Sequence, residues 1–444
     1  MSDLFIIGAS GAKAYRSAMA AISENIANAG TAGYARRSVT MAESGSSTAT
    51  MATYISRANF GGVQVTGVKR ATDPYLDATV RSTGTALGSA TARLRWLTDA
   101  ETALNDSSTG IGQLMSGMYQ NMEKLAASPT DKSLRVTTLD SIGRVAQAFN
   151  QTAADLETVS SGIATEAKAS VDTVNAALDA LGAINNSLLR AQPGTSAYAQ
   201  LLDSRDAALS DLTANLNVTV TFGSHDSAEI SFGGQTLVTG SSATRIAVAA
   251  NTDGTLALSL DDGTALATPG SGTLGGLFSS AGTVADRRAS LDTLAAQFVT
   301  DINAWHAQGR TDAGAPGAPL LSGTTAATLS ALVTDPAELA TRSADGKLNG
   351  NLLNVTTALR GNGSVEQNWT AIISAQATLL ATTKAEHDTA TSRNDQAVAA
   401  REAVSGVDLD MEAADLLRIQ QAYSASAKVL QIAKETIDSI LNIR

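Results

Sequence analysis

Residues of the types that catalyse reactions are few in this chain, and their spacing argues against a catalytic role. The three histidines, His225, His306 and His387, lie far apart in the sequence and show none of the short spacings of metal-binding histidines. The chain has no cysteine, which excludes thiol catalysis and disulfide bonds. No nucleophile is paired with a base in a recognisable motif. These observations predict a protein that is not an enzyme and has neither catalytic nor metal-binding residues.

Three short segments carry glycine or acidic residues at spacings that invite a ligand-binding interpretation. Residues 270–275 fit the pattern G-x-G-x-x-G, but they do not clearly join a strand to a helix, so we expect a flexible turn and no cofactor. Residues 408–412 hold three carboxylates without the turn glycine and distal glutamate of a calcium loop. The electrostatics of a helix start explain these carboxylates better. Residues 203–206 are expected to form an ion pair in a helical bundle.

Composition narrows the class of protein further. A chain of 444 residues is long enough for two or three domains. A net charge of −11 argues against a nucleic-acid-binding surface, and no apolar run is long enough for membrane insertion. Aromatic residues make up only 4% of the chain, which favours long, closely packed helices over a deep core with a large pocket. The chain start lacks the basic segment of a cleaved signal peptide, and this alone indicates a cytoplasmic protein.

The C-terminal segment has the clearest helical pattern. Residues 408–444 contain neither glycine nor proline, and their first turn is acidic, as the helix dipole favours. Apolar residues three and four apart predict one stripe of an amphipathic helix, which Gln420 and Lys434 interrupt. The larger members of this stripe are Leu409, Leu416, Tyr423, Leu430, Ile437 and Leu441. A helix of about 33 residues is a rod of roughly 50 Å that cannot bury its own stripe, so it needs a partner surface.

The N-terminal segment is the expected partner. Residues 4–28 have a second helical pattern with a seam of mostly small residues, and small residues allow two helix axes to come close. We therefore expect the two ends of the chain to pair in a coiled-coil-like rod. Periodicity alone leaves an alternative open, in which both segments are ordinary core helices of one globule.

The middle of the chain predicts a mainly helical body with an inserted β domain. One helix, from about residue 131 to 191, is unusually long. The hydrophobic period changes to two near residue 218, hairpin signals follow, and the helical pattern resumes at residue 283. The fold class is thus mainly α with an inserted β domain. The expected divisions are a rod of residues 1–35 plus 405–444, a body of residues 36–216 plus 281–404 with a hairpin near 61–70, and a β domain of residues 217–280.

Motifs occur after the first helix and in four later segments of the chain. The residues after the first helix, Asn25, Asn28, Gly33, Tyr34 and Arg36, resemble a motif shared by flagellar rod, hook and hook-associated proteins. That motif alone does not separate these proteins. Further similarity to the hook-associated protein 1 family lies in residues 125–129 with Arg135, 201–206, 302–314 and 437–444.

The resemblance implies a structural subunit at the junction between hook and filament. It implies paired termini that form the inner domain of a helical tube built by self-association. The implied partners are the hook protein, the second junction hook-associated protein and, indirectly, the flagellin filament, with a cytoplasmic export chaperone at the C-terminal segment. It also implies an extracellular location, reached by type III export without a cleaved signal peptide.

The alternative is another flagellar axial protein, such as the hook or distal rod protein. These proteins share both terminal patterns. The long helical stretch from residue 78 to 216 argues against this alternative, because strands dominate the body of the hook protein in that family's pattern.

Overall fold

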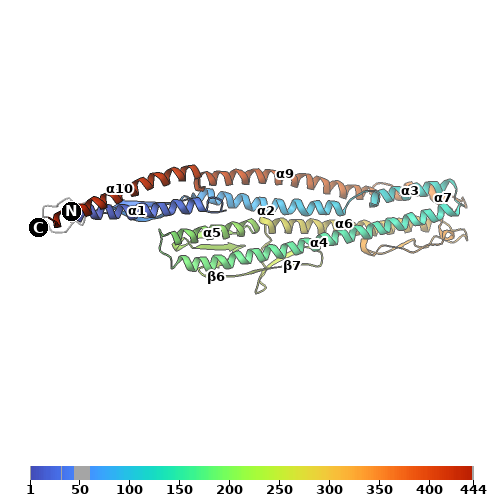
Figure 1. Ribbon diagram of the computed structural model, residues 1–444. Helices are drawn as coiled ribbons and strands as arrows, with labels where there is room; N and C mark the ends of the chain where they lie inside the picture. Colours follow the sequence, from blue (N-terminus) through green and yellow to red (C-terminus); the bar gives the residue numbers. More distant parts are fainter. Residues whose placement is uncertain (1, 32, 45–60, 443–444) are drawn as a thin grey trace.

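The molecule is an elongated helical structure with both ends of the chain at the same tip (Figure 1). The computed structural model describes residues 2–31, 33–44 and 61–442. Helices α1 (Ser2–Ala27) and α10 (Leu409–Leu441) lie side by side and run antiparallel, as the contacts of Gly8 with Leu430 and of Asn25 with Glu412 require. The expected pairing of the two ends is therefore present, and the alternative of a single globule does not hold.

A β-hairpin runs along the same pair of helices. Strand β1 (Arg37–Glu43) pairs antiparallel with β2 (Val63–Arg70), with Arg37 opposite Arg70. Val39 and Met41 of β1 pack against α1, and the Val63 amide donates to the Ser10 hydroxyl at 3.2 Å. The sequence prediction placed this hairpin in the body, whereas it packs on α1. We call α1, α10 and this hairpin the terminal rod.

Two layers of long helices form the body (Figure 1). Helices α2, α9 and α3 lie in one layer, where α2 packs against α9, and α4, α5 and α6 lie in the other. Contacts of α2 with α6 and of α3 with α4 join the two layers. The bounds of these helices are α2 (Pro74–Ala103), α3 (Ile111–Ala127), α4 (Lys132–Leu188), α5 (Ser196–Asn215), α6 (Gly272–Gln308) and α9 (Val365–Ser405). The 57 residues of α4 confirm the predicted long helix, which Asp131 caps through the amides of Ser133 and Leu134.

The inserted strands pack against α4. An antiparallel sheet has the order β3 (Thr219–Phe222), β4 (Ala228–Phe232), β5 (Gln235–Thr239) and β6 (Ser242–Ala243), and β7 (Ile246–Ala250) pairs with β8 (Leu256–Leu260). The last of these strands ends at Leu260, within the expected β domain of 217–280. Residues from Gly272 onward already belong to α6. The glycines there hide the helical pattern, because Gly276 allows the backbone of α2 at Ser89 to come close.

Short elements complete the end of the body that lies away from the termini. They are β9 (Leu321–Ser322), β10 (Ser330–Ala331), α7 (Gly350–Leu353), α8 (Val355–Leu359) and the 3-10 helices η2 (Ala326–Thr328) and η3 (Pro336–Glu338). A further 3-10 helix, η1 (Ser224–Asp226), lies between β3 and β4.

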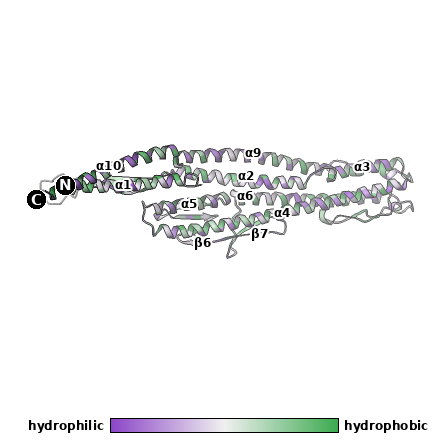
Figure 2. Ribbon diagram, viewed as in Figure 1, coloured by the Kyte–Doolittle hydropathy of each residue, from purple (hydrophilic) through white to green (hydrophobic). Residues whose placement is uncertain are grey.

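One hydrophobic core extends through the body and includes Phe149, Phe298, Trp305 and Trp369. The terminal rod has its own small cluster of Ala18, Ile22 and Ile419. Apolar residues alternate with polar ones along both rod helices in Figure 2. None of the helices among the described residues combines the length and the hydropathy that crossing a membrane requires.

Candidate functional site

Small residues bring the two rod helices close together. The α1 positions that face α10 include Gly8, Gly11, Ala14 and Ala18, all of them buried. A Cβ atom added at Gly8 would lie 2.9 Å from Leu430 Cγ. Such a separation is too short for two carbon atoms in van der Waals contact, so glycine at position 8 allows Leu430 to pack against α1. The predicted small-residue seam of the N-terminal helix therefore lies at the helix interface.

The face of α10 that meets α1 is rotated relative to the predicted stripe. Leu416 and Leu430 are half-buried, but Leu409, Tyr423 and Ile437 are 53%, 37% and 38% exposed. Leu441 ends the helix, and its side chain is outside the described set. The buried positions between Leu416 and Leu430 and on either side of them are Glu412, Ile419 and Ala433, with half-buried Ser426. A stripe drawn from hydrophobicity misses Glu412, Ser426 and Ala433, because a carboxylate, a hydroxyl and an alanine do not signal a helix interface.

Large apolar side chains remain exposed on the terminal rod. On α1, Leu4, Phe5 and Ile6 are each about half exposed (48%, 49% and 51%). On α10, Leu417 is 61% exposed and Ile432 is 53% exposed, and helical geometry directs both away from the α1 interface. Pairing with α1 therefore covers only part of the apolar surface of α10, and the remainder faces outward along the rod.

Asn25 is the centre of a buried polar cluster at the base of the rod. Its side-chain amide donates to the Arg37 carbonyl at 2.9 Å and to Glu412 Oε2 at 3.1 Å. Its carbonyl oxygen accepts from the Tyr34 hydroxyl at 2.8 Å and from the Arg37 amide at 2.9 Å. Asn25 is 1% exposed and all its hydrogen-bonding capacity is used, so it joins α1, the turn after α1, β1 and α10 at one point.

Three of the other sequence-predicted residues contribute to this cluster. Tyr34 is half-buried under the guanidinium of Arg37, and burial raises the pKa of its hydroxyl to about 12, so the phenol stays a donor at neutral pH. Arg36 lies 3.6 Å from the Glu412 carboxylate. Gly33 has φ of +78°, the left-handed conformation that turns the chain from α1 towards Tyr34.

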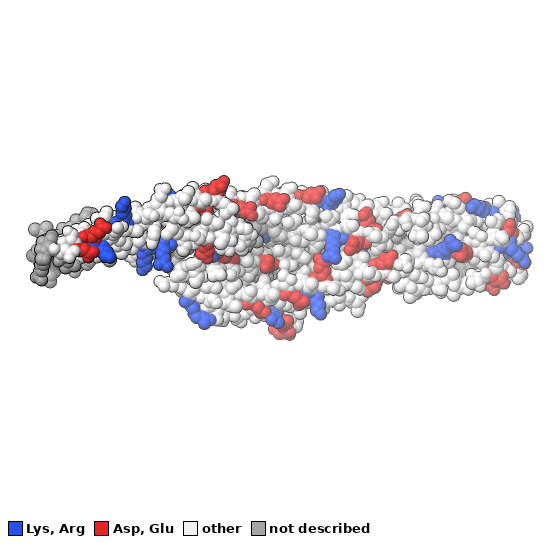
Figure 3. Space-filling model, in the orientation of Figure 1, with Lys and Arg blue, Asp and Glu red and all other residues white. Residues whose placement is uncertain are grey.

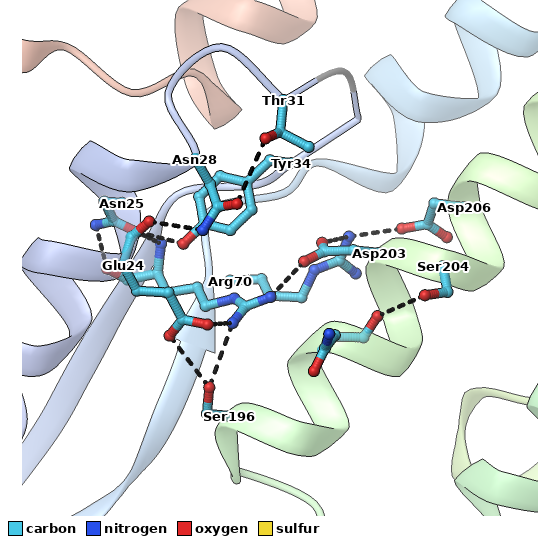
Figure 4. A network of polar contacts seen from close by, with 12 residues as sticks. Glu24, Asn25, Asn28, Thr31, Tyr34, Arg70, Ser196, Asp203, Ser204 and Asp206 are labelled. Atoms are coloured by element: carbon cyan, nitrogen blue, oxygen red, sulfur yellow. Dashed lines mark hydrogen bonds and ion pairs between the residues drawn. The ribbon is translucent and has the colours of Figure 1, made fainter.

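Asn28 has a local role: its backbone amide bonds the Asn25 carbonyl at 3.2 Å, and its side chain bonds residues outside the cluster around Asn25. Its side-chain amide donates to the Glu24 carbonyl at 2.9 Å, and its oxygen accepts from the Thr31 hydroxyl at 3.4 Å. Asn28 therefore closes the last turn of α1 (Figure 4).

A chain of ion pairs ties the terminal rod to the body, and sequence reasoning missed most of it. Arg37 pairs with Glu24 of α1 at 2.5 Å and with Asp203 of α5 at 2.7 Å. Arg70 of β2 pairs with Asp203 at 2.7 Å and with Asp206 at 2.8 Å. The two arginines are directly opposite each other in the hairpin. Figure 4 shows the carboxylate of Asp203 projecting from α5 towards the hairpin. The joint between rod and body is therefore an alternating row of charges in which the two arginines are buried and the carboxylates are partly exposed.

The one sequence signal for these ion pairs was the acidic and basic run 203–206. The expectation of an ion pair there is met by Arg205 and Asp206, whose side chains are 2.6 Å apart. Nothing in the sequence indicated that Asp203 would reach Arg37, because 166 residues separate them. Within the described ranges, no group of three or more His, Asp or Glu side chains is arranged to hold a metal ion.

Comparisons with known proteins agree with this geometry. Residues 97–321 match the family described as flagellar hook-associated protein FlgK helical domain. Residues 402–443 match the family described as flagellar basal body rod FlgEFG protein C-terminal. The chain is similar to flagellar hook-associated protein 1 of Bacillus subtilis, with 23% identity over 97% of this chain and 96% of that one. It is 24% identical to the Salmonella typhimurium protein of the same name, over the full length of both.

The fold is similar to that of the flagellar hook junction protein FlgK from Burkholderia pseudomallei, with a TM-score of 0.67 and 13% identity. That likeness covers 73% of this chain and all of the other.

The fold defines a class of elongated, mainly helical proteins whose two ends pair in a rod and whose body carries inserted strands. The match across residues 97–321, about half of the sequence, is to a model of one family within that class. The chain belongs to the flagellar hook-associated protein FlgK family, whose members are structural proteins of the flagellum at the hook–filament junction. The alternative of a hook or distal rod protein is not supported, because only the C-terminal 402–443 match is shared with rod proteins.

Proposed function

We propose that this chain is the subunit that joins hook to filament, and that it assembles through its terminal rod into a helical tube. The observation that carries this proposal is the set of apolar side chains left exposed on the rod, chiefly Leu4, Phe5, Ile6, Leu417 and Ile432. Burying one such side chain completely is worth roughly 1.5–3 kcal/mol. Packing among rods of neighbouring subunits supplies the burial that the α1–α10 pair alone does not.

The sequence-predicted residues fall into two proposed roles. Leu409, Tyr423 and Ile437 have exposed side chains on α10 and would contact neighbouring subunits, whereas Leu416 and Leu430 hold α10 on α1. Asn25, Gly33, Tyr34 and Arg36 would act within the subunit, by fixing the joint from which the rod extends. The division into rod, body and β domain serves the same purpose, because the rod carries assembly and the body fills the outer layer.

The neighbours in this proposal are the hook protein on one side and the second junction protein on the other, with the flagellin filament beyond it. Before assembly, a cytoplasmic chaperone would cover the exposed apolar side chains of α10. Export would follow the flagellar type III route without a cleaved signal peptide. Acidic and basic side chains are interspersed along the face drawn in Figure 3, so the proposed contacts do not depend on one charged patch there. No enzymatic activity is part of the proposal.

Substituting one outward leucine tests the assembly surface. Leu417→Asp places a charge on the face of α10 away from α1, so the subunit should fold normally but fail to join hook tips, leaving cells without filaments. Leu353→Asp is the matched control, because Leu353 is similarly exposed (63%, against 61% for Leu417) but lies in α7 of the body. Electron microscopy of hooks and a motility assay in cells lacking the native copy provide the measurement.

Leu430→Asp adds the complementary change at the α1 interface. It should also block incorporation, while the body keeps its melting temperature. Normal junctions in both Leu417→Asp and Leu430→Asp cells would refute assembly through the rod.

A further inference from the structure

Asn25 and Glu412 form a polar pair inside an otherwise apolar or small-residue interface. The Asn25 amide donates to Glu412 Oε2 at 3.1 Å across the two rod helices. Both side chains are almost completely buried, at 1% and 3% exposure. A carboxylate buried at this depth must keep its partners, because an unpaired buried charge is costly.

The rest of the interface distinguishes one alignment of the helices from another only weakly. Gly11 lies opposite Ser426, and Ala18 packs near Ile419. Two close steric fits, Gly8 against Leu430 and Gly11 against Ser426, require glycine on α1 but would tolerate other small neighbours on α10. Because α1 presents small residues seven apart, Gly11 and Ala18, α10 can slide by one heptad and still meet small side chains on α1.

Either one-heptad slide separates the polar pair. In one direction the slide places Ile419 beside Asn25, whose amide then loses its acceptor on α10. In the other direction it places Glu412 beside Ala18, which leaves the carboxylate without a donor. Both slides therefore bury a polar group without its partner, and the native alignment alone avoids this cost.

We propose that the Asn25–Glu412 pair fixes the register of α10 on α1. The pair acts as a specificity element, in the way that a single buried polar residue fixes the register of a coiled coil. Register matters for this subunit because it sets which outward side chains of α10 lie beside which side chains of α1 on the rod surface. The inference depends on the helix pairing alone and not on the proposed junction role.

Engineered cysteine pairs measure the register directly in the full chain, which has no cysteine of its own. Gly11→Cys with Ser426→Cys reports the native alignment, because a Cβ at Gly11 would lie 3.4 Å from Ser426 Cβ, near the separation found in disulfides. Gly11→Cys with Ala433→Cys reports one slide, and Gly11→Cys with Ile419→Cys reports the other. The initial rates of disulfide formation in dilute protein give a native-to-slid ratio that counts only paired helices.

In the parent chain the native pair should form its disulfide at least about tenfold faster than either slid pair. Glu412→Leu should lower this ratio by roughly tenfold. Glu412→Gln keeps an acceptor for the Asn25 amide, so it should retain the native ratio. That rescue separates the hydrogen bond from the charge that faces Arg36.

The double variant Asn25→Leu with Glu412→Leu keeps the position packed with apolar side chains if Glu412→Leu alone weakens pairing. Slid cross-links should appear in it as well. A native ratio that persists in Glu412→Leu or in the double variant would overturn the proposal, and so would a loss in Glu412→Gln as large as that in Glu412→Leu.

Discussion

The hydroxyl of Tyr34 gives the most direct test of a single residue. Because it donates to Asn25 at 2.8 Å, Tyr34→Phe should cost about 1 kcal/mol locally. That cost corresponds to a roughly fivefold loss of hydrogen-exchange protection in the segment from α1 to β1. Tyr75→Phe is the control, because Tyr75 is 76% exposed on α2 and its exchange should not change. If Tyr34 instead served only as a contact between subunits, Tyr34→Phe would leave protection intact while impairing assembly.

His306 makes stability depend on pH. Its Nδ1 hydrogen-bonds the Ala318 carbonyl at 2.6 Å, so Nδ1 carries the proton, and its Nε2 accepts the Ala340 amide at 2.8 Å. Burial lowers the pKa of this imidazole below its ordinary value of 6.5. The neutral form is therefore the folded form. Stability from this group is complete above pH 6.5 and falls as the pH drops towards the lower folded pKa, since only the unfolded chain gains the proton.

Melting temperatures measured between pH 7.5 and 5 check the role of His306. The native chain should lose more stability over this range than His306→Gln, whose side chain does not titrate. His387→Gln is the control, because His387 is partly exposed and lies beside Asp388 at the surface of α9. Equal pH profiles for the native chain and His306→Gln would contradict the assignment.

Sequence reasoning predicted the end of the first helix, because the residues that end it act locally. Gly33 and Asn28 end α1 through contacts within a few residues, and such turn chemistry can be read from sequence. The partners that complete the joint could not be found this way. Glu412 bonds Asn25 although 387 residues of sequence separate them. Neither residue type indicates from sequence alone that its side chain will form a buried hydrogen bond. The resemblance to a family identified Asn25 but not the contact that gives it a role.

At the scale of the helix, replacing two interior glycines by alanine should change the stability of the body in opposite directions. Gly162 lies in the middle of α4, where the ring of Trp96 occupies the space that a Cβ would need. Gly282 lies in the middle of α6 with open space at that position. Gly162→Ala should therefore lower the stability of the body by about 1–3 kcal/mol through overpacking. Gly282→Ala should raise it by roughly 0.5–1 kcal/mol, because alanine is the better helix former.

Urea unfolding of the two glycine variants, followed by far-ultraviolet circular dichroism, provides the comparison. Shifts of the same sign for Gly162→Ala and Gly282→Ala would show that the packing of Trp96 on α4 is looser than described.

Helices were predicted best where caps and breaks are strong. The Asp131 cap and the Gln192–Gly194 break define α4 in the sequence as they do in the structure. The start of α6 was placed eleven residues too late, at 283 and not at Gly272. Its first turns rely on packing against α2, and single-sequence propensity does not register such tertiary support. The face of α10 was misjudged for the same reason, since Glu412 and Ser426 are buried only because α1 is there.

At the scale of the whole molecule, order in the rod should depend on assembly. The rod cluster contains only Ala18, Ile22 and Ile419 as buried apolar residues, whereas the core of the body is continuous. Residues 410–440 of the soluble chain should therefore exchange their amide hydrogens much faster than the centre of α4. Assembly into junctions should protect the same residues. Strong protection of residues 410–440 in the unassembled chain would count against this account.

The overall architecture could be anticipated because its two ends carry matching patterns. A small-residue seam on the N-terminal helix and an apolar stripe on the C-terminal helix together predicted a pair that is separated by nearly the whole chain. The position of the hairpin was not predictable in this way, because alternation in residues 63–68 indicates a strand but not the helix on which it rests.

The backbone of Arg36 lies between the only two covalent links that connect the terminal rod to the body within the described residues. Its amide donates to the Ser405 carbonyl at 2.9 Å, at the end of α9, and its carbonyl accepts from the Ala71 amide at 2.8 Å, just before α2. Both links therefore meet at a single pivot. In the proposed assembly, bending of the rod against the body would therefore be resisted at Arg36 and at the neighbouring ion pairs of Arg37 and Arg70. A rotating flagellum would load this pivot on every turn.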